Sequence, residues 1–196
     1  MRKPLSIFSL SLAAWWLLAG AALAETPMAY VRGILDKTMG IQNDAALTEA
    51  SRRPRIQQII EKSFDFPMMA KDALGPAYGQ LSFGQRQEFT GVFSQLFQDS
   101  YTRLVLNFLK KENVEYHRET RENSKARVDT TIVRTNESIP VTYRMHSTPQ
   151  GWILYDVIVD GVSILDTYQR QFSQVIRTNS LEFLLNRMQT QVRALK

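Results

Sequence analysis

The apolar residues of this chain change their spacing twice, and this change limits the folds that the chain can adopt. Between Ser82 and Phe108 they recur every three or four positions over about seven turns, which is typical of one long amphipathic helix. From Val114 to Val159 they alternate with polar residues, which is typical of strands. A helical spacing returns from Asp166 to Leu195. Helices, then strands, then a helix predict an α+β fold.

The long helix has the best-defined start. Ser82 followed by Gln85 three residues later predicts a capping box, in which each side chain binds the other residue's backbone N–H. The apolar positions that follow form one large aromatic face. For such a stripe alone, ordinary core packing is the simplest interpretation, and a role in lining a cavity needs support from elsewhere.

Three shorter helices are predicted before it. The first covers Pro27–Thr38 and ends at Gly40, because glycine commonly ends helices. A second segment covers residues 44–63, with a kink or break just before Pro54, because proline disrupts helix interiors. Asp65 is positioned to cap a short third helix.

The alternating region divides into four strands joined by short turns, so an antiparallel sheet of about four strands is expected. Its apolar segments are residues 114–117, 126–132, 139–145 and 152–159, and a shorter one at 162–165 follows the Asp160-Gly161 turn. We expect the helices to stack on one face of this sheet.

The amino terminus predicts export. Arg2 and Lys3 precede an apolar run, Leu5 to Leu18, which is followed by Ala22-Leu23-Ala24. This pattern is typical of a secretory signal peptide with cleavage after Ala24. We expect residues 1–24 to be the signal peptide and residues 25–196 to form a single domain in the periplasm; an uncleaved anchor is the alternative. The chain has no cysteine, which excludes a lipid anchor on cysteine and any disulfide.

Charge gives no sign of nucleic-acid binding. The formal net charge is +5, and Arg2 and Lys3 of the expected signal peptide supply part of it. Arg52, Arg53 and Arg55 form the only tight basic group, and no aromatic residue lies among them. This group is expected to be a solvated helix face, or alternatively a docking patch for a partner protein.

The sequence also lacks the usual patterns of catalysis. Its two histidines, His117 and His146, have no second ligand at a metal-binding spacing, so no metal or cofactor is expected. Nucleotide-binding loops and hydrolase motifs are missing. Asp160 is best explained by its turn, although Asp156 shares its strand face. A hydrolase or isomerase would need convergent polar groups in a cavity, so we predict that the protein is not an enzyme.

Three stretches together resemble the MlaC family, also called toluene-tolerance proteins. They are Phe64 to Ala70 with Ala73-Leu74-Gly75, Gln85 to Phe89 with Phe93, Leu96 and Tyr101, and Tyr155 to Ser163 with Tyr168 and Gln171-Phe172. The third stretch is the most specific. Two departures stand out: Tyr78 replaces a frequent Trp, and Thr167-Tyr168-Gln169 replaces a frequent Asn-Tyr-Arg.

This resemblance implies a pocket between a curved sheet and the helices that binds the acyl chains of a phospholipid and leaves the head group outside. It further implies shuttling between an outer-membrane lipoprotein–porin complex and an inner-membrane ABC transporter complex with a substrate-binding ring, which maintains outer-membrane lipid asymmetry. A hopanoid-associated branch of the family leaves a hopanoid as an alternative cargo. A solid-cored, non-catalytic adaptor of the transporter, without lipid, is another alternative.

On this basis ten residues are predicted to line the pocket, and two arginines, Arg144 and Arg170, are predicted at its mouth near the head group. The predicted lining is Phe93, Phe97, Tyr101, Val128, Ile132, Tyr143, Val157, Val159, Tyr168 and Phe172.

Overall fold

The computed structural model describes residues 25–110 and 112–195, so the predicted signal peptide lies outside the described residues. Within them, seven helices and five strands follow one another along the chain. The helices are α1 (Pro27–Asn43), α2 (Glu49–Ser63), α3 (Phe66–Leu74), α4 (Pro76–Gln80), α5 (Phe83–Phe108), α6 (Ile164–Thr178) and α7 (Leu181–Leu195). The strands are β1 (Asn113–Glu122), β2 (Lys125–Val133), β3 (Ser138–Thr148), β4 (Gly151–Val159) and β5 (Val162–Ser163).

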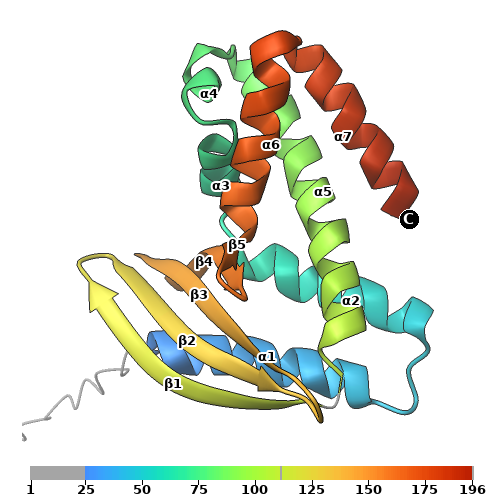
Figure 1. Cartoon of the computed structure of the whole chain (residues 1–196), viewed down its shortest axis with the longest axis vertical. Helices are drawn as coiled ribbons and strands as arrows, with labels where there is room; N and C mark the ends of the chain where they lie inside the picture. Colours follow the sequence, from blue (N-terminus) through green and yellow to red (C-terminus); the bar gives the residue numbers. More distant parts are fainter. Residues whose placement is uncertain (1–24, 111, 196) are drawn as a thin grey trace, which may run out of the picture.

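The strands form one antiparallel sheet in which each strand pairs with the next along the chain. This confirms the predicted sheet, to which β5 adds a strand of two residues. Figure 1 shows that the long strands are curved and that they pass in front of α1. Ala126, Val128 and Thr130 of β2 are buried, whereas Arg127 between them is exposed. The helices therefore cover the face to which the three buried residues point, and the α+β architecture is confirmed.

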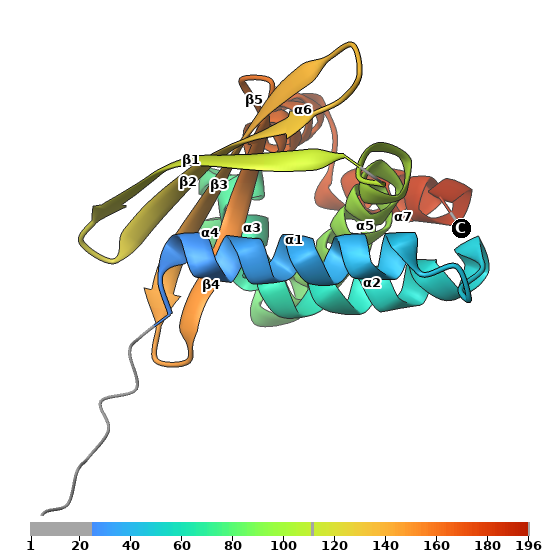
Figure 2. The same ribbon diagram turned by 90° about the horizontal axis from the view of Figure 1, so that it is seen from below.

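The helices fall into two groups that cover different parts of the sheet. Helices α1 and α2 run side by side, and α1 packs on β1 and β2 (Figure 2). Helices α3 and α6 pack on β4 and on each other, and α7 packs along α5. The helix α5 contacts both groups.

Helix α5 begins as the sequence predicts. The Ser82 backbone N–H donates to Gln85 Oε1 at 2.9 Å, and the Gln85 N–H donates to Ser82 Oγ at 3.3 Å, which completes the capping box. The helix has 26 residues, so at 1.5 Å per residue it is about 39 Å long. Figure 1 shows one half of it beside α6 and α7 and the other half passing α2.

The first two helices differ from the prediction. Helix α1 continues through Gly40 to Asn43, because Met39 and Ile41 beside this glycine pack against the core. Such burial outweighs the roughly 1 kcal/mol that a glycine costs inside a helix. Helix α2 begins at Glu49 with Thr48 as its N-cap, and it continues through Pro54 without a break. Pro54 is the sixth residue of α2, close to its N-terminal end, where the first four backbone N–H groups have no partner within the helix. A proline, which has no N–H, is less disruptive near this end than in the middle of a helix.

The predicted final helix is two helices. Asn179 has extended backbone angles and ends α6, and its side-chain amide donates to Val175 O at 3.3 Å. The Ser180 hydroxyl then accepts a hydrogen bond from the Phe183 N–H at 3.2 Å, in the first turn of α7. Both residues bind nearby backbone groups, which is why they favour helix ends over helix interiors.

A buried carboxylate joins the sheet to α6. Asp156 is 1% exposed, and its Oδ2 accepts a hydrogen bond from Ser163 Oγ at 2.7 Å while its Oδ1 accepts one from the Leu165 N–H at 3.1 Å. Arg144 Nη1 lies 3.5 Å from the same carboxylate. Ser163 also caps α6 through the Asp166 N–H at 2.9 Å. The turn between β4 and β5 uses positive φ angles at Asp160 and Gly161.

We predict that Asp156→Ala lowers the free energy of unfolding by about 2–4 kcal/mol, because it leaves a buried hydroxyl and a backbone N–H without their acceptor. Urea denaturation followed by circular dichroism measures this change. Asp166→Ala is the control: this exposed carboxyl lies in the first turn of α6, and its loss should cost less than about 1 kcal/mol. Equal losses in both variants would contradict the role of Asp156.

Candidate functional site

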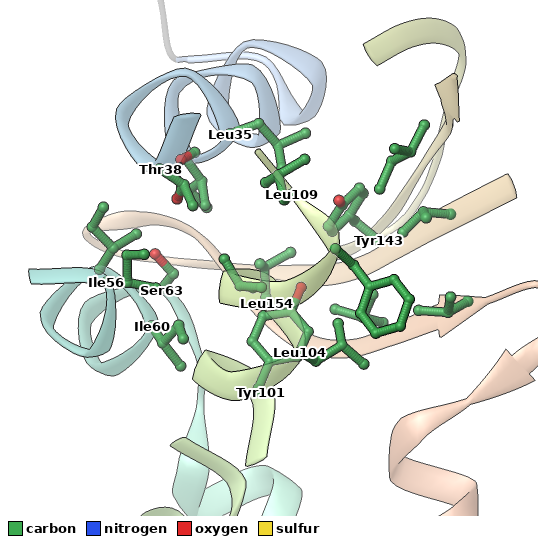
Figure 3. A pocket seen from close by; sticks show the side chains of 18 of the residues that line it. Leu35, Thr38, Ile56, Ile60, Ser63, Tyr101, Leu104, Leu109, Tyr143 and Leu154 are labelled. Atoms are coloured by element: carbon green, nitrogen blue, oxygen red, sulfur yellow. Dashed lines mark hydrogen bonds between the residues drawn. The ribbon is translucent and has the colours of Figure 1, made fainter. Parts of the chain in front are cut away.

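An apolar cavity of about 150 Å³ lies between the sheet and the helices α1, α2 and α5 (Figure 3). Residues from both helix and sheet converge on it because each element turns its apolar face inward. It is lined by Ile34, Leu35, Thr38, Ile56, Ile59, Ile60, Ser63, Phe64, Tyr101, Leu104, Val105, Phe108, Leu109, Ile132, Ile139, Val141, Tyr143, Leu154, Val157 and Val159.

All of the lining residues are uncharged. The only polar side-chain groups among them are the hydroxyls of Thr38, Ser63, Tyr101 and Tyr143. The Thr38 hydroxyl already donates to the Ile34 carbonyl at 2.8 Å. Such a wall favours hydrocarbon, and a charged group inside it would lack a counter-ion.

The cavity brings together half of the predicted lining residues. Tyr101 contributes from α5, Ile132 from β2, Tyr143 from β3, and Val157 and Val159 from β4. Val128, the register partner of Tyr143, is fully buried but does not line the cavity. The contact of these residues with a lipid stays a prediction.

The four predicted aromatic residues Phe93, Phe97, Tyr168 and Phe172 pack on one another instead. The ring centroid of Phe93 lies 5.5 Å from that of Tyr168 and 6.2 Å from that of Phe172. Phe97 lies 6.3 Å from Tyr168 and 5.1 Å from Phe64. This group of rings joins α5 to α6, and in this conformation it fills the core beside the cavity.

The two arginines predicted at the mouth do not line the cavity either. Arg144 lies against Asp156 at the junction of β4 and α6. Arg170 is exposed on α6, where its Nη2 donates to Thr167 Oγ1 at 3.2 Å. A head-group contact for either arginine stays a prediction.

The contribution of α1 and α2 to the cavity was not predicted from the sequence. Leu35 and Thr38 reach the cavity from α1, and Ile56, Ile59 and Ile60 reach it from α2. Their spacing of three and four residues was visible in the sequence. Periodicity identifies the buried face of a helix but does not say what that face covers, so only the three-dimensional packing assigns these residues to the cavity.

One end of the cavity is close to solvent. Phe108, in the last turn of α5, is 46% exposed although it lines the cavity. Leu104, Ile139 and Val159 are half-buried, whereas Leu154 and Ile56 are almost fully buried. The cavity is therefore most accessible where α5 ends.

Burial raises the pKa of two tyrosines in the wall. The pKa of Tyr101 is above its usual value of 10 because the ring is desolvated. The pKa of Tyr143 is raised well above 10, mainly by burial and further by Tyr101 and Tyr116, although a hydrogen bond with Thr130 lowers it. Both hydroxyls are neutral at physiological pH.

The histidines lie elsewhere and have local partners. His146 Nε2 lies 2.8 Å from Asp65 Oδ2, which ties β3 to the start of α3, and His117 Nε2 lies 2.8 Å from Thr131 Oγ1. In the described part of the chain, His, Cys, Asp and Glu nowhere gather in threes suited to a metal ion. Over the same residues, every helix is too short or too polar to cross a membrane.

Comparison with known proteins gives similar sequences and a similar fold. The family described as MlaC protein matches residues 33–190. A protein of Haemophilus influenzae, named intermembrane phospholipid transport system binding protein MlaC, is 22% identical over 200 residues, which cover 96% of this chain and 92% of that protein. The solved structure of a phospholipid-binding protein from Ralstonia solanacearum, in complex with a phospholipid, has a TM-score of 0.76 and 20% identity. The structural match covers 87% of this chain and 98% of the Ralstonia solanacearum chain.

The raised tyrosine pKa values predict a loss of stability in alkali. Above pH 10 the unfolded chain releases these protons while the folded chain retains them, so the free energy of unfolding falls by up to about 1.4 kcal/mol per pH unit for each tyrosine. Tyr101→Phe should therefore lose about 1.4 kcal/mol less than the wild type between pH 9 and pH 11. Urea denaturation at both pH values tests this, and identical losses would mean that Tyr101 ionises in the folded state.

Proposed function

The chain belongs to the MlaC family, and on this premise we propose that it is a periplasmic carrier that binds the acyl chains of a phospholipid in its apolar cavity. The observation that carries the proposal is the cavity itself, which has uncharged walls from α1, α2, α5 and three strands. The name of the Haemophilus influenzae relative and the phospholipid bound to the Ralstonia solanacearum protein support the same cargo.

The energetics explain why a carrier is needed. Two acyl chains contain on the order of 30 methylenes, and at about 0.8 kcal/mol for each their transfer out of water is worth roughly 20 kcal/mol or more. Unassisted passage through water is therefore negligible. The interior of a bilayer is as apolar as the cavity, so transfer from membrane to protein is close to neutral and can run in either direction. The protein lowers the barrier rather than driving the transfer.

The volume of the cavity indicates that loading changes it. About 150 Å³ is the size of an engineered protein cavity that admits benzene. Acyl chains need several times this volume, so the lining helices and the sheet must separate as a lipid enters. Gln42 and Gln57 lie where this separation would occur: Gln42 Nε2 donates to the Leu109 carbonyl at 2.9 Å, and Gln57 Nε2 donates to Asp99 Oδ1 at 2.7 Å.

The finer parts of the proposal concern location and partners. Cleavage after Ala24 would release residues 25–196 into the periplasm as one lipid-binding domain. There the protein would shuttle phospholipid between an outer-membrane lipoprotein–porin complex and an inner-membrane ABC transporter complex with a substrate-binding ring, and so maintain outer-membrane lipid asymmetry. Docking is required because a lipid that moves between two apolar surfaces in contact never exposes its chains to water.

The proposal is tested by native mass spectrometry of protein purified from the periplasm, followed by lipid extraction. We expect the mass of residues 25–196 together with one diacyl phospholipid. A bound hopanoid instead of a phospholipid would change the identity of the cargo and leave the carrier function unchanged. Protein that is purified without lipid and does not take up phospholipid from added vesicles would refute the carrier function. The remaining explanation would then be the adaptor that carries no lipid.

A variant that fills the cavity is predicted to bind less lipid. Leu104→Trp adds a large ring to the wall near the accessible end, so we expect the bound lipid to fall at least about tenfold, since the ring and the chains compete for one space. Arg103→Trp, at the exposed neighbouring position, should keep wild-type occupancy. Circular dichroism checks that both variants fold. Phe97 is unsuitable for this test because its ring is 1% exposed and packs in the core.

A further inference from the structure

A second hollow lies beside the accessible end of the apolar cavity, around the turn between β2 and β3. This turn lies next to the end of α5, where Arg134 Nη2 donates to the Phe108 carbonyl at 3.1 Å (Figure 1). We call the hollow the rim hollow. It has a volume of about 460 Å³ and is lined by Glu112, Val133, Arg134, Thr135, Asn136 and Glu137. Unlike the cavity, it has charged side chains in its wall.

Arg134 connects the rim hollow to the cavity. Its guanidinium carbon lies 5.2 Å from the centre of the Phe108 ring, which lines the cavity and is 46% exposed. Ile132, two residues earlier in the chain, and its register partner Ile139 also line the cavity. The charged group and the apolar wall are therefore neighbours. A molecule whose apolar part fills the cavity at this end can place a polar part against Arg134.

Arg134 lies between two carboxylates that differ in exposure. The side chain of Glu112 is only 13% exposed: its Oε1 accepts from Arg134 Nη2 at 3.2 Å, and its Oε2 accepts from the Lys110 backbone N–H. The side chain of Glu137 is 58% exposed, and its Oε2 lies 3.5 Å from Arg134 Nη1. Glu112 therefore anchors the guanidinium, whereas Arg134 and Glu137 form a loose, solvated pair that contributes little to stability.

A loose pair of opposite charges matches a ligand that also carries two opposite charges. A phosphate oxygen can bind Arg134 Nη1, which carries two N–H groups, and an ammonium group can bind the carboxylate of Glu137. Both charges of such a ligand are then paired, and the exchange costs only one weak ion pair. A head group with a phosphate but no amine would pair with the guanidinium and leave the Glu137 carboxylate without a partner.

We propose that Arg134 and Glu137 form a subsite for the head group of a zwitterionic lipid, with the phosphate on Arg134 and the ammonium group on Glu137. This inference rests on the proposed function and specifies its cargo: a phospholipid with an amine, such as phosphatidylethanolamine, rather than an anionic one, such as phosphatidylglycerol. The apolar cavity supplies most of the affinity, and the rim hollow selects among lipids.

The test mixes delipidated, full-length mature protein with vesicles that contain equal amounts of phosphatidylethanolamine and phosphatidylglycerol with the same acyl chains. Native mass spectrometry measures the ratio of the two bound lipids. Both lipids come from the same membrane, so docking of the protein on the vesicle is common to them. We expect about a 2- to 5-fold excess of phosphatidylethanolamine, which corresponds to one partly exposed ion pair. Glu137→Gln should bring this ratio close to one.

Two further variants separate the roles of the charges. Arg134→Gln removes the group to which either phosphate binds, so the binding of both lipids should fall by about 2- to 5-fold. Glu182→Gln is the matched control for Glu137→Gln, because it removes the same charge from an exposed site in the first turn of α7, outside the cavity and the rim hollow. It should keep the wild-type ratio. Circular dichroism checks that each variant folds.

Equal binding of the two lipids by the wild type, or an excess of phosphatidylglycerol, would overturn the subsite and leave the carrier function intact. A wild-type ratio in Glu137→Gln would also overturn it, and the charged residues of the rim hollow would then serve only to join the turn to α5. Failure of the wild type to bind either lipid would overturn both proposals. If Arg134→Gln does not fold, Glu137→Gln decides the result, because the Glu137 side chain is exposed.

Discussion

The length of α5 is the constraint on which the rest of this structure depends. A helix of about 39 Å extends well past the sheet, so its two halves need different partners. The first half is covered by α3, α6 and α7, with Phe93 against Tyr168 and Phe172. The second half faces α1, α2 and the strands across a space that their side chains do not fill. The cavity lies where this second set of partners meets.

This division explains what the sequence predicts and what it leaves open. Spacing and turn chemistry are local, and they correctly predict the long helix α5, the antiparallel sheet and the capping box at Ser82. The continuous aromatic stripe of α5, however, does not reveal where one set of partners gives way to the other. Phe93 and Phe97 therefore fill a core, whereas Tyr101 lines the cavity only one turn later.

Helix ends were the less predictable part of the fold for a related reason. Gly40 and Pro54 are helix breakers by local preference, yet both lie inside helices: the apolar neighbours of Gly40 are held in the core, and Pro54 lies near the start of α2. The break at Asn179 and Ser180 follows from side chains that bind nearby backbone groups. The two arginines predicted at the mouth show the same limit, since charge alone does not give a position relative to a cavity.

The junction at Asp156 has a mechanical consequence. It fixes α6 to β4, while the Asp65 N–H donates to the Leu154 carbonyl at 2.8 Å and fixes the start of α3 to the same strand. Hydrogen bonds thus join the sheet, α3 and α6 into one body. The α1–α2 pair is pinned to this body at one end, where the Met28 N–H donates to Glu119 Oε2 at 2.8 Å, and at its far end Gln42 bonds to carbonyls of α5. Entry of a lipid between the pair and α5, as proposed, would break the Gln42 bonds at this far end and leave the Met28 bond at the sheet in place.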